Sequence, residues 1–170
     1  VNPSNPPSVA VSGKSMRRLV QLVKSKRPDL IIITDDVYGT FVPGFRSAMA
    51  ELPQNTIFVY SYSKHFGCTG WRLGVVAVHQ NNIFDKMIAK GTQDPFVYYG
   101  RAMELRGLGR SSESLEAFRE LRERFSAYVP QYLMAGQLAA ELGDVTLARA
   151  LFEQGLRQAQ LAGDSHAHSE

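Results

Sequence analysis

No lysine, asparagine or isoleucine occurs after Lys90 in this 170-residue chain. The balance of charge also changes there: the first 90 residues hold 11 Lys and Arg against 5 Asp and Glu, whereas the remainder holds 8 against 11. This change predicts two segments of different origin, joined at residues 91–93 by natural fusion or as an engineered chimera. We therefore treat residues 1–90 and 94–163 as separate domains, followed by a tail at 164–170 that we expect to fray.

Apolar runs in the first segment predict three β-strands, at residues 30–33, 56–60 and 73–78. The first run is apolar throughout, which is typical of a central parallel strand covered on both faces. Ser12 is placed to cap a helix over about 13–26, and Asn81 or Asn82 to cap another that ends at Lys90. This order predicts a piece of a doubly wound α/β sheet, with exposed faces where neighbouring elements would pack.

Residues 61–74 carry the side chains that indicate chemistry. Lys64 lies between hydroxyl side chains just after a predicted strand, where α/β proteins hold ligands. A lysine shielded from water there can supply a free amine for Schiff-base chemistry. Ser61 and Arg72 suit a phosphate group, as a hydroxyl donor and a guanidinium fork, so together with Lys64 they point to pyridoxal 5'-phosphate. The alternative is that Lys64 is an exposed lysine that merely follows a strand.

Three motifs carry a family resemblance. Ser-x-Ser-Lys followed by Gly-Trp-Arg-x-Gly, in residues 61–74, resembles the cofactor-lysine segment of fold-type I pyridoxal-phosphate enzymes, the aspartate aminotransferase superfamily. Residues 2–8, Asn-Pro-Ser-Asn-Pro-Pro-Ser, resemble that family's Asn-Pro-Thr-Gly loop, with Pro7 and Ser8 in place of Thr-Gly. Residues 35–38 resemble its Asp-x-x-Tyr. The residues of these motifs are most similar to the aspartate 4-decarboxylase branch of the family, and the resemblance covers roughly residues 1 to 90.

The resemblance implies an α/β fragment of the large domain of a fold-type I transferase, with pyridoxal 5'-phosphate as cofactor. It implies that Lys64 is the catalytic residue that holds the cofactor covalently and shuttles the substrate's α-proton. It places Asp35 at the pyridine nitrogen, with Asn5 and Tyr38 at the phenolic oxygen. The other residues that it assigns to the cofactor are Ser61, Ser63 and Arg72.

The implied reaction converts L-aspartate to L-alanine and CO₂, with transamination as a side activity, in a homo-oligomer. The family's glycine-containing phosphate loop, ring-stacking aromatic residue and small-domain arginine have no counterpart in the sequence. We therefore expect an incomplete site, and the sequence alone assigns no activity to the chain.

The second segment is helical in pattern. Four helices are expected, at about 95–107, 112–125, 129–141 and 145–161. The two halves repeat after 34 residues, with small residues at matching positions; the matched residues are Tyr98 and Tyr132, Ala102 and Gly136, Ser114 and Ala148, and Phe118 and Phe152. This period resembles the tetratricopeptide repeat, an all-α helical hairpin repeat, with copies at 94–127 and 128–161. It implies an alternative function, a module that binds a peptide or protein, with the α/β segment as a non-catalytic remnant.

Other features narrow the choice of partners and setting. The net charge of +3 comes without a basic helix face, which argues against nucleic acid, and no apolar run reaches the length of a membrane span. The single cysteine, Cys68, excludes an internal disulfide and favours a reducing, cytoplasmic setting. The four histidines lack metal-ligand spacing, so no metal site is predicted. Trp71 is expected to pack beneath the cofactor loop and to position Arg72.

Overall fold

The computed structural model describes residues 1–163, so the tail expected to fray at 164–170 lies outside the described residues. The chain forms two compact units that meet in the sequence between Ile83 and Phe84. The boundary precedes the helix at 84–89, whereas the expected junction at 91–93 follows it. The reason is that packing assigns a helix to the core its side chains enter, whatever the composition of its sequence. From residue 1 to 163, no helix is both long and apolar enough to cross a membrane.

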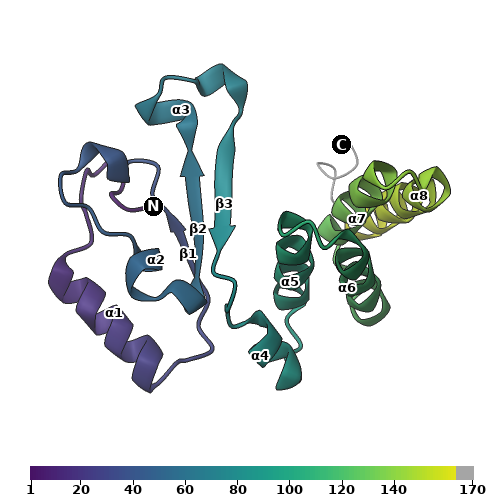
Figure 1. Cartoon of the computed structure of the whole chain (residues 1–170), viewed down its shortest axis with the longest axis horizontal. Helices are drawn as coiled ribbons and strands as arrows, with labels where there is room; N and C mark the ends of the chain where they lie inside the picture. The colour runs from purple at the N-terminus through teal and green to yellow at the C-terminus, as the bar shows by residue number, and fades with distance from the viewer. Residues whose placement is uncertain (164–170) are drawn as a thin grey trace. The chain divides into compact units, whose positions relative to one another are not determined.

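The first unit is a small sheet with short helices around it (Figure 1). Its elements are α1 Gly13–Ser25, β1 Ile32–Asp35, η1 Gly39–Phe41, α2 Ala48–Glu51, η2 Pro53–Asn55, β2 Thr56–Ser61, α3 Tyr62–His65, η3 Thr69–Trp71 and β3 Gly74–Val78. Helix α1 begins as predicted, because the Ser12 hydroxyl accepts the N–H of Ser15 at 3.1 Å. The predicted strands at 56–60 and 73–78 also form, within one residue at each end.

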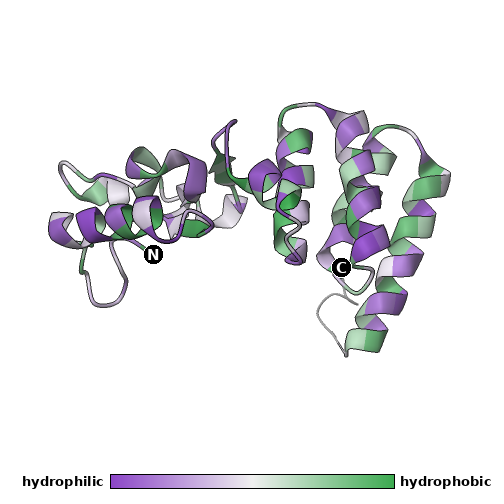
Figure 2. Cartoon of the chain, turned by 90° about the horizontal axis from the view of Figure 1, so that it is seen from below, coloured by the Kyte–Doolittle hydropathy of each residue, from purple (hydrophilic) through white to green (hydrophobic). Residues whose placement is uncertain are grey.

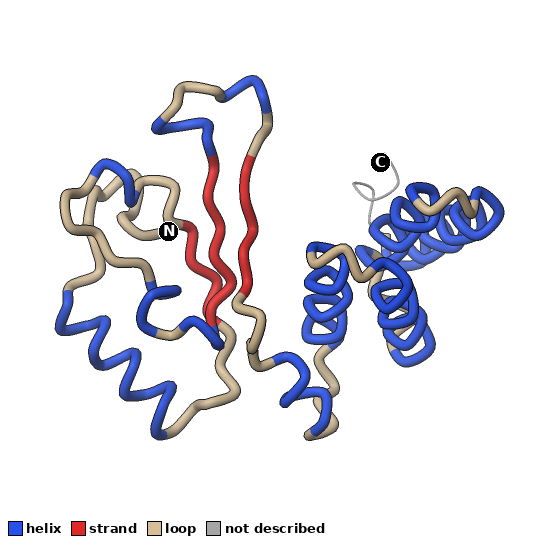
Figure 3. Tube along the Cα trace, viewed as in Figure 1, coloured by secondary structure: helices blue, strands red, loops and turns tan. Residues whose placement is uncertain are grey.

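Strand β2 is the middle strand of the sheet, parallel to β1 and antiparallel to β3 (Figure 3). The expectation that residues 30–33 form a central strand is therefore wrong: β1 lies at an edge, and Ile33 is 60% exposed. An apolar run reports the composition of a strand, not how many strands lie beside it. The strand also starts later than predicted, because the Asn55 amide binds the carbonyls of Pro28 and Leu30, both at 3.0 Å, and keeps that stretch in a loop.

The second unit contains α4 Phe84–Ala89, α5 Pro95–Gly107, α6 Ser111–Arg124, α7 Pro130–Glu141 and α8 Val145–Ala162. The last four helices lie within one residue of their predicted ends, and α4 ends at Ala89, one residue before the predicted end at Lys90. Consecutive helices pack together along the series from α4 to α8. The α5–α6 and α7–α8 turns contain Gly109 at φ 72° and Gly143 at φ 83°, a left-handed conformation that glycine adopts at little cost.

Small residues let the helices of the second unit approach closely. The Ser114 hydroxyl, fully buried, donates to the Ala102 carbonyl at 2.8 Å, joining α6 to α5. A Cβ added at Gly155 in α8 would lie 2.7 Å from the Tyr132 Cβ in α7. Figure 2 shows both apolar and polar residues along these helices.

Burial within this core raises the pKa of the Tyr99 and Tyr128 hydroxyls, a direction typical of phenols among apolar side chains.

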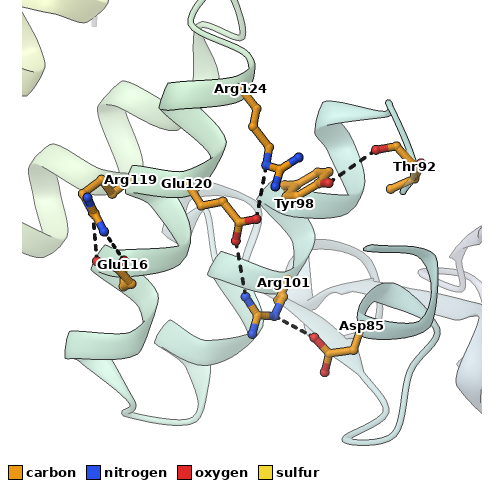
Figure 4. A network of polar contacts seen from close by, with 8 residues as sticks. All are labelled: Asp85, Thr92, Tyr98, Arg101, Glu116, Arg119, Glu120 and Arg124. Carbon is orange, nitrogen blue, oxygen red and sulfur yellow. Dashed lines mark hydrogen bonds and ion pairs between the residues drawn. The ribbon is translucent and has the colours of Figure 1, made fainter. Parts of the chain in front are cut away.

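A network of charged side chains ties α4, α5 and α6 together (Figure 4). Arg101 pairs with Asp85 at 2.6 Å and with Glu120 at 4.0 Å. Glu120 also pairs with Arg124 at 3.3 Å, and the Arg124 guanidinium lies 5.6 Å from the Tyr98 ring centroid. Ion pairs that remain partly exposed contribute about 0 to 1 kcal/mol each, so the network orients these helices more than it stabilises them.

We expect Gly155→Ala to destabilise the second unit by about 1–3 kcal/mol, because the added methyl meets a Tyr132 Cβ that is fixed by a buried ring. Gly107→Ala is the matched control, since a Cβ there meets nothing within 4 Å. The measurement is urea unfolding of the full chain followed by circular dichroism at 222 nm. Equal midpoints for the two variants would contradict the close packing of α7 and α8.

Candidate functional site

Two adjacent carboxylates end β1 in different surroundings. Asp36 is buried, and one of its carboxylate oxygens accepts the Thr34 hydroxyl at 2.6 Å. Asp35 is half-buried, and its Oδ1 accepts the N–H of Val37 at 3.1 Å, which fixes the carboxylate at the start of the following turn. Of the two, Asp35 is therefore the carboxylate that a ligand can approach from solvent.

Asn5 meets Tyr38 just beyond this turn. The Asn5 side-chain amide donates to the Tyr38 hydroxyl at 2.8 Å, across 33 residues of sequence. The N-terminal loop is held nearby, because the N–H of Asn2 donates to the Asp35 carbonyl at 2.8 Å. The Tyr38 hydroxyl accepts from Asn5, so its own proton can be donated to a further acceptor. Two neutral donors at one point suit an anionic oxygen.

Lys64 lies in α3, a single helical turn at the end of β2. Ser61 caps that turn, since its hydroxyl accepts the N–H of Ser63 at 3.1 Å. The Lys64 side chain is exposed. Within the described residues, no hydrogen bond or ion pair joins its ammonium to Asp35, Asn5 or Tyr38.

Thr69 connects the predicted phosphate ligands and was missed by the sequence analysis. Its hydroxyl donates to the Ser63 carbonyl at 3.1 Å, and its own carbonyl accepts Nη1 of Arg72 at 3.4 Å. Ser63 and Arg72 are thus held to one loop, with Ser61 at its start. A threonine beside a glycine is common in loops, so no sequence pattern indicates this role.

Arg72 has a left-handed backbone, at φ 51° and ψ 36°. Such a conformation costs a residue other than glycine about 1–3 kcal/mol, and strain of this kind clusters at functional sites. Trp71, the preceding residue, is 76% exposed, so the expectation that it packs beneath the cofactor loop is wrong. It is the last residue of η3, in the connection between β2 and β3.

Phe41 lies between the turn that contains Tyr38 and the helical turn that contains Lys64. Its ring lies 6.3 Å from the Tyr38 ring on one side and packs edge-on against the His65 imidazole at 5.4 Å on the other. His65 follows Lys64 directly in α3. Sequence reasoning overlooked Phe41, although a 3₁₀ turn places residues three apart on the same side and would have paired it with Tyr38.

Comparison with known proteins identifies the family of the chain. Residues 1–128 match the family of class I and II aminotransferases. Because the match covers more than half of the chain, the chain belongs to this aminotransferase family. Enzymes of the family depend on pyridoxal 5'-phosphate.

Several curated relatives match part of the chain. A bifunctional aspartate aminotransferase and L-aspartate beta-decarboxylase from Pseudomonas sp is 54% identical over 90 residues, 53% of this chain and 17% of its own length. Aspartate aminotransferase from Sulfolobus acidocaldarius is 38% identical over 90 residues, 51% of this chain and 22% of its own length. Aspartate aminotransferase from Pyrococcus abyssi is 30% identical over 134 residues, which are 73% of this chain and 33% of its own length. The chain thus spans a third or less of these relatives.

The residues present fit this cofactor in their hydrogen-bonding capacity. Tyr38 retains its hydroxyl proton after accepting from Asn5, which suits a phenolic oxygen. Ser61 likewise accepts at its hydroxyl oxygen and keeps its proton for a phosphate. Arg72 uses one nitrogen on the Thr69 carbonyl and keeps the rest of its fork.

Gly74 pairs with Ser61 at the base of the loop that carries Lys64, at residues 62–73. We expect Gly74→Ala to separate the two ends of this loop. An added Cβ would lie 2.9 Å from the Tyr60 carbonyl oxygen, a backbone atom that cannot move cheaply, where Ser61 pairs with Gly74. We expect the free energy of unfolding to fall by about 1 kcal/mol or more, and trypsin to cleave faster after Lys64 and Arg72. Gly70→Ala, with nothing within 4 Å of its Cβ, is the control. Cleavage at the wild-type rate in Gly74→Ala would refute this role.

Proposed function

We propose that the first unit is the cofactor-lysine part of a pyridoxal-phosphate enzyme that acts on L-aspartate. The proposed reaction removes the β-carboxyl group as CO₂ and places a proton on the β-carbon, which gives L-alanine; transamination is a side activity. The 54% identity to the bifunctional decarboxylase, against 38% and 30% to two aspartate aminotransferases, favours this branch. The observation that carries the proposal is the Asn5–Tyr38 hydrogen bond beside Asp35.

The proposed roles follow from the chemistry of each side chain. The Asp35 carboxylate would keep the pyridine nitrogen protonated, and Asn5 and Tyr38 would donate to the phenolic oxygen. Ser61, Ser63 and Arg72 would hold the phosphate. Lys64 would hold the cofactor through Nζ and, when substrate displaces it, take the α-proton at that atom. When bound, the cofactor supplies an electron-withdrawing ring that accepts the electron pair of the broken bond.

The chain covers 17% of the length of the bifunctional relative, so we place the activity in a larger assembly. Groups that contact the substrate carboxylates and stack on the ring would come from outside residues 1–83. A homo-oligomer, or association with the remaining part of such an enzyme, would supply them. Cofactor binding at Lys64 is therefore the property to test in this chain before any assay with aspartate.

We expect pyridoxal phosphate to label Lys64 specifically. The purified full chain is mixed with the cofactor, reduced with borohydride and mapped by mass spectrometry. Labelling should saturate at Lys64 and be weak at Lys14, Lys24, Lys26, Lys86 and Lys90. Arg72→Gln should raise the half-saturating concentration by about 10- to 100-fold, the range for a lost charged hydrogen bond.

Lys86→Arg serves as the matched control for this experiment, because Lys86 is exposed on α4 and belongs to the other unit. It should leave the labelling of Lys64 unchanged, whereas Lys64→Arg should abolish specific labelling. Labelling spread evenly over all six lysines would mean that the first unit does not hold the cofactor, and would contradict the proposal.

A second function, a tetratricopeptide-type interaction module, is favoured by one observation in the second unit. The Tyr98 hydroxyl donates to the Thr92 carbonyl at 3.4 Å, and the Tyr132 hydroxyl to the Ser126 carbonyl at 2.8 Å. Both donors and both acceptors are 34 residues apart, so the contacts follow the sequence period. In this reading α5 and α7 present a shared face to a peptide, with Arg106 bound to the Met134 carbonyl.

Peptides selected against the full chain from a random display library provide the test of this second function. We expect such a peptide to bind Lys64→Ala as tightly as the wild type and to protect amides of α5 and α7 from hydrogen exchange. A peptide that protects only amides of the first unit would count against the interaction module. Loss of binding in Lys64→Ala would do the same.

A further inference from the structure

We propose that Phe41 is a positioning residue that couples the Tyr38 turn to the helical turn carrying Lys64. The inference rests on the proposed function, because it gives Phe41 a part in holding the cofactor's ligands in register. The centroid of the Phe41 ring lies 6.3 Å from that of the Tyr38 ring and 5.4 Å from that of the His65 imidazole, with interplanar angles of 41° and 67°. Both are within the range of favourable aromatic pairs.

The need for such a contact follows from the length of α3. A helix of four residues forms a single turn, which is not stable on its own in water. Backbone bonding between the β1 and β2 segments extends as far as the Asp36 N–H on the Val59 carbonyl, which lies before Tyr38 in one segment and before Lys64 in the other. Beyond that bond, Phe41 contacts the residue adjacent to Lys64 as well as Tyr38 itself.

The exposure of Phe41 argues against a role in the core alone. Its side chain is 56% exposed, more than is usual for a residue retained to bury apolar surface. The backbone nevertheless holds it in place, because its N–H donates to the Tyr38 carbonyl at 3.1 Å within η1. Replacing the ring should therefore change the positions of its two neighbours more than it changes the stability of the unit.

The test compares Phe41→Leu, Phe41→Tyr and Val42→Ala with the wild-type full chain. Val42 is the exposed neighbour of Phe41 and serves as the matched control. In Phe41→Leu we expect the half-saturating pyridoxal phosphate concentration for Lys64 labelling to rise about 2- to 10-fold, the equivalent of one aromatic pair. Phe41→Tyr keeps a ring and should restore the wild-type value, and Val42→Ala should not differ from it.

Proton NMR of the His65 imidazole gives a readout that needs no cofactor. The rings of Phe41 and Phe66 both lie close to the imidazole, so the ring-current shift of its protons should fall to the Phe66 contribution in Phe41→Leu and keep its wild-type value in Val42→Ala. His65→Gln identifies the resonances. Thermal unfolding followed by circular dichroism checks that the variants are folded.

The outcomes separate the two proposals. If wild-type Lys64 is labelled but Phe41→Leu is labelled at the same concentration, the inference is overturned and the proposed function stands. If wild-type Lys64 is not labelled specifically, the proposed function fails, and the positioning role toward the cofactor fails with it. A His65 ring shift that is unchanged in Phe41→Leu overturns the contact itself.

Discussion

The pairing of β2 with a different neighbour on each side positions the candidate ligands on β1, β2 and β3 and in the loops beside them. A parallel neighbour contributes the residues that follow it, and an antiparallel neighbour contributes the residues that precede it. Strand β1 therefore delivers Asp35 and Tyr38, and Arg72 lies two residues before β3 begins, at the edge where β2 ends in Ser61. Three stretches separated by up to 37 residues of sequence reach one edge of the sheet without any long-range side-chain contact being needed to bring them there. Asn5 and Phe41 then refine positions that the backbone has already set.

The second unit depends on a different constraint, the close approach of helices. Ser114, Ala102 and Gly155 occupy positions where a larger side chain would meet a neighbouring helix. These small residues let the aromatic rings of the core fill the space between hairpins rather than hold them apart. The ends of these helices could be predicted closely because glycine turns and buried small residues leave little freedom in where a helix stops.

How far the sequence predicted the structure differs between local and non-local features. The Ser12 cap, β2 and the four helices of the second unit were predicted because they depend on residues that are near in sequence. The edge position of β1 and the exposure of Trp71 depend on which elements lie alongside, and no local pattern records that. In the candidate site, the three motifs were found through their resemblance to a known family, and the structure joins Asn5 to Tyr38. Thr69 and Phe41 were missed because their roles arise from a backbone carbonyl and a ring contact, which leave no mark on composition.

Phe118 and Phe152 occupy equivalent positions of the 34-residue period but are unequal in burial, at 1% and 36% exposed. The difference reflects their places in the series: α6 has a helix hairpin on its far side, whereas α8 ends the described helices. A stack in which each hairpin covers the aromatic residue of the one before it behaves as a one-dimensional polymer, with stability that grows by a nearly constant increment per hairpin. Within the described residues, α6 packs against α5 and α7 whereas α8 packs mainly against α7, so the ring of the end helix keeps a share of its surface in water that the internal ring loses.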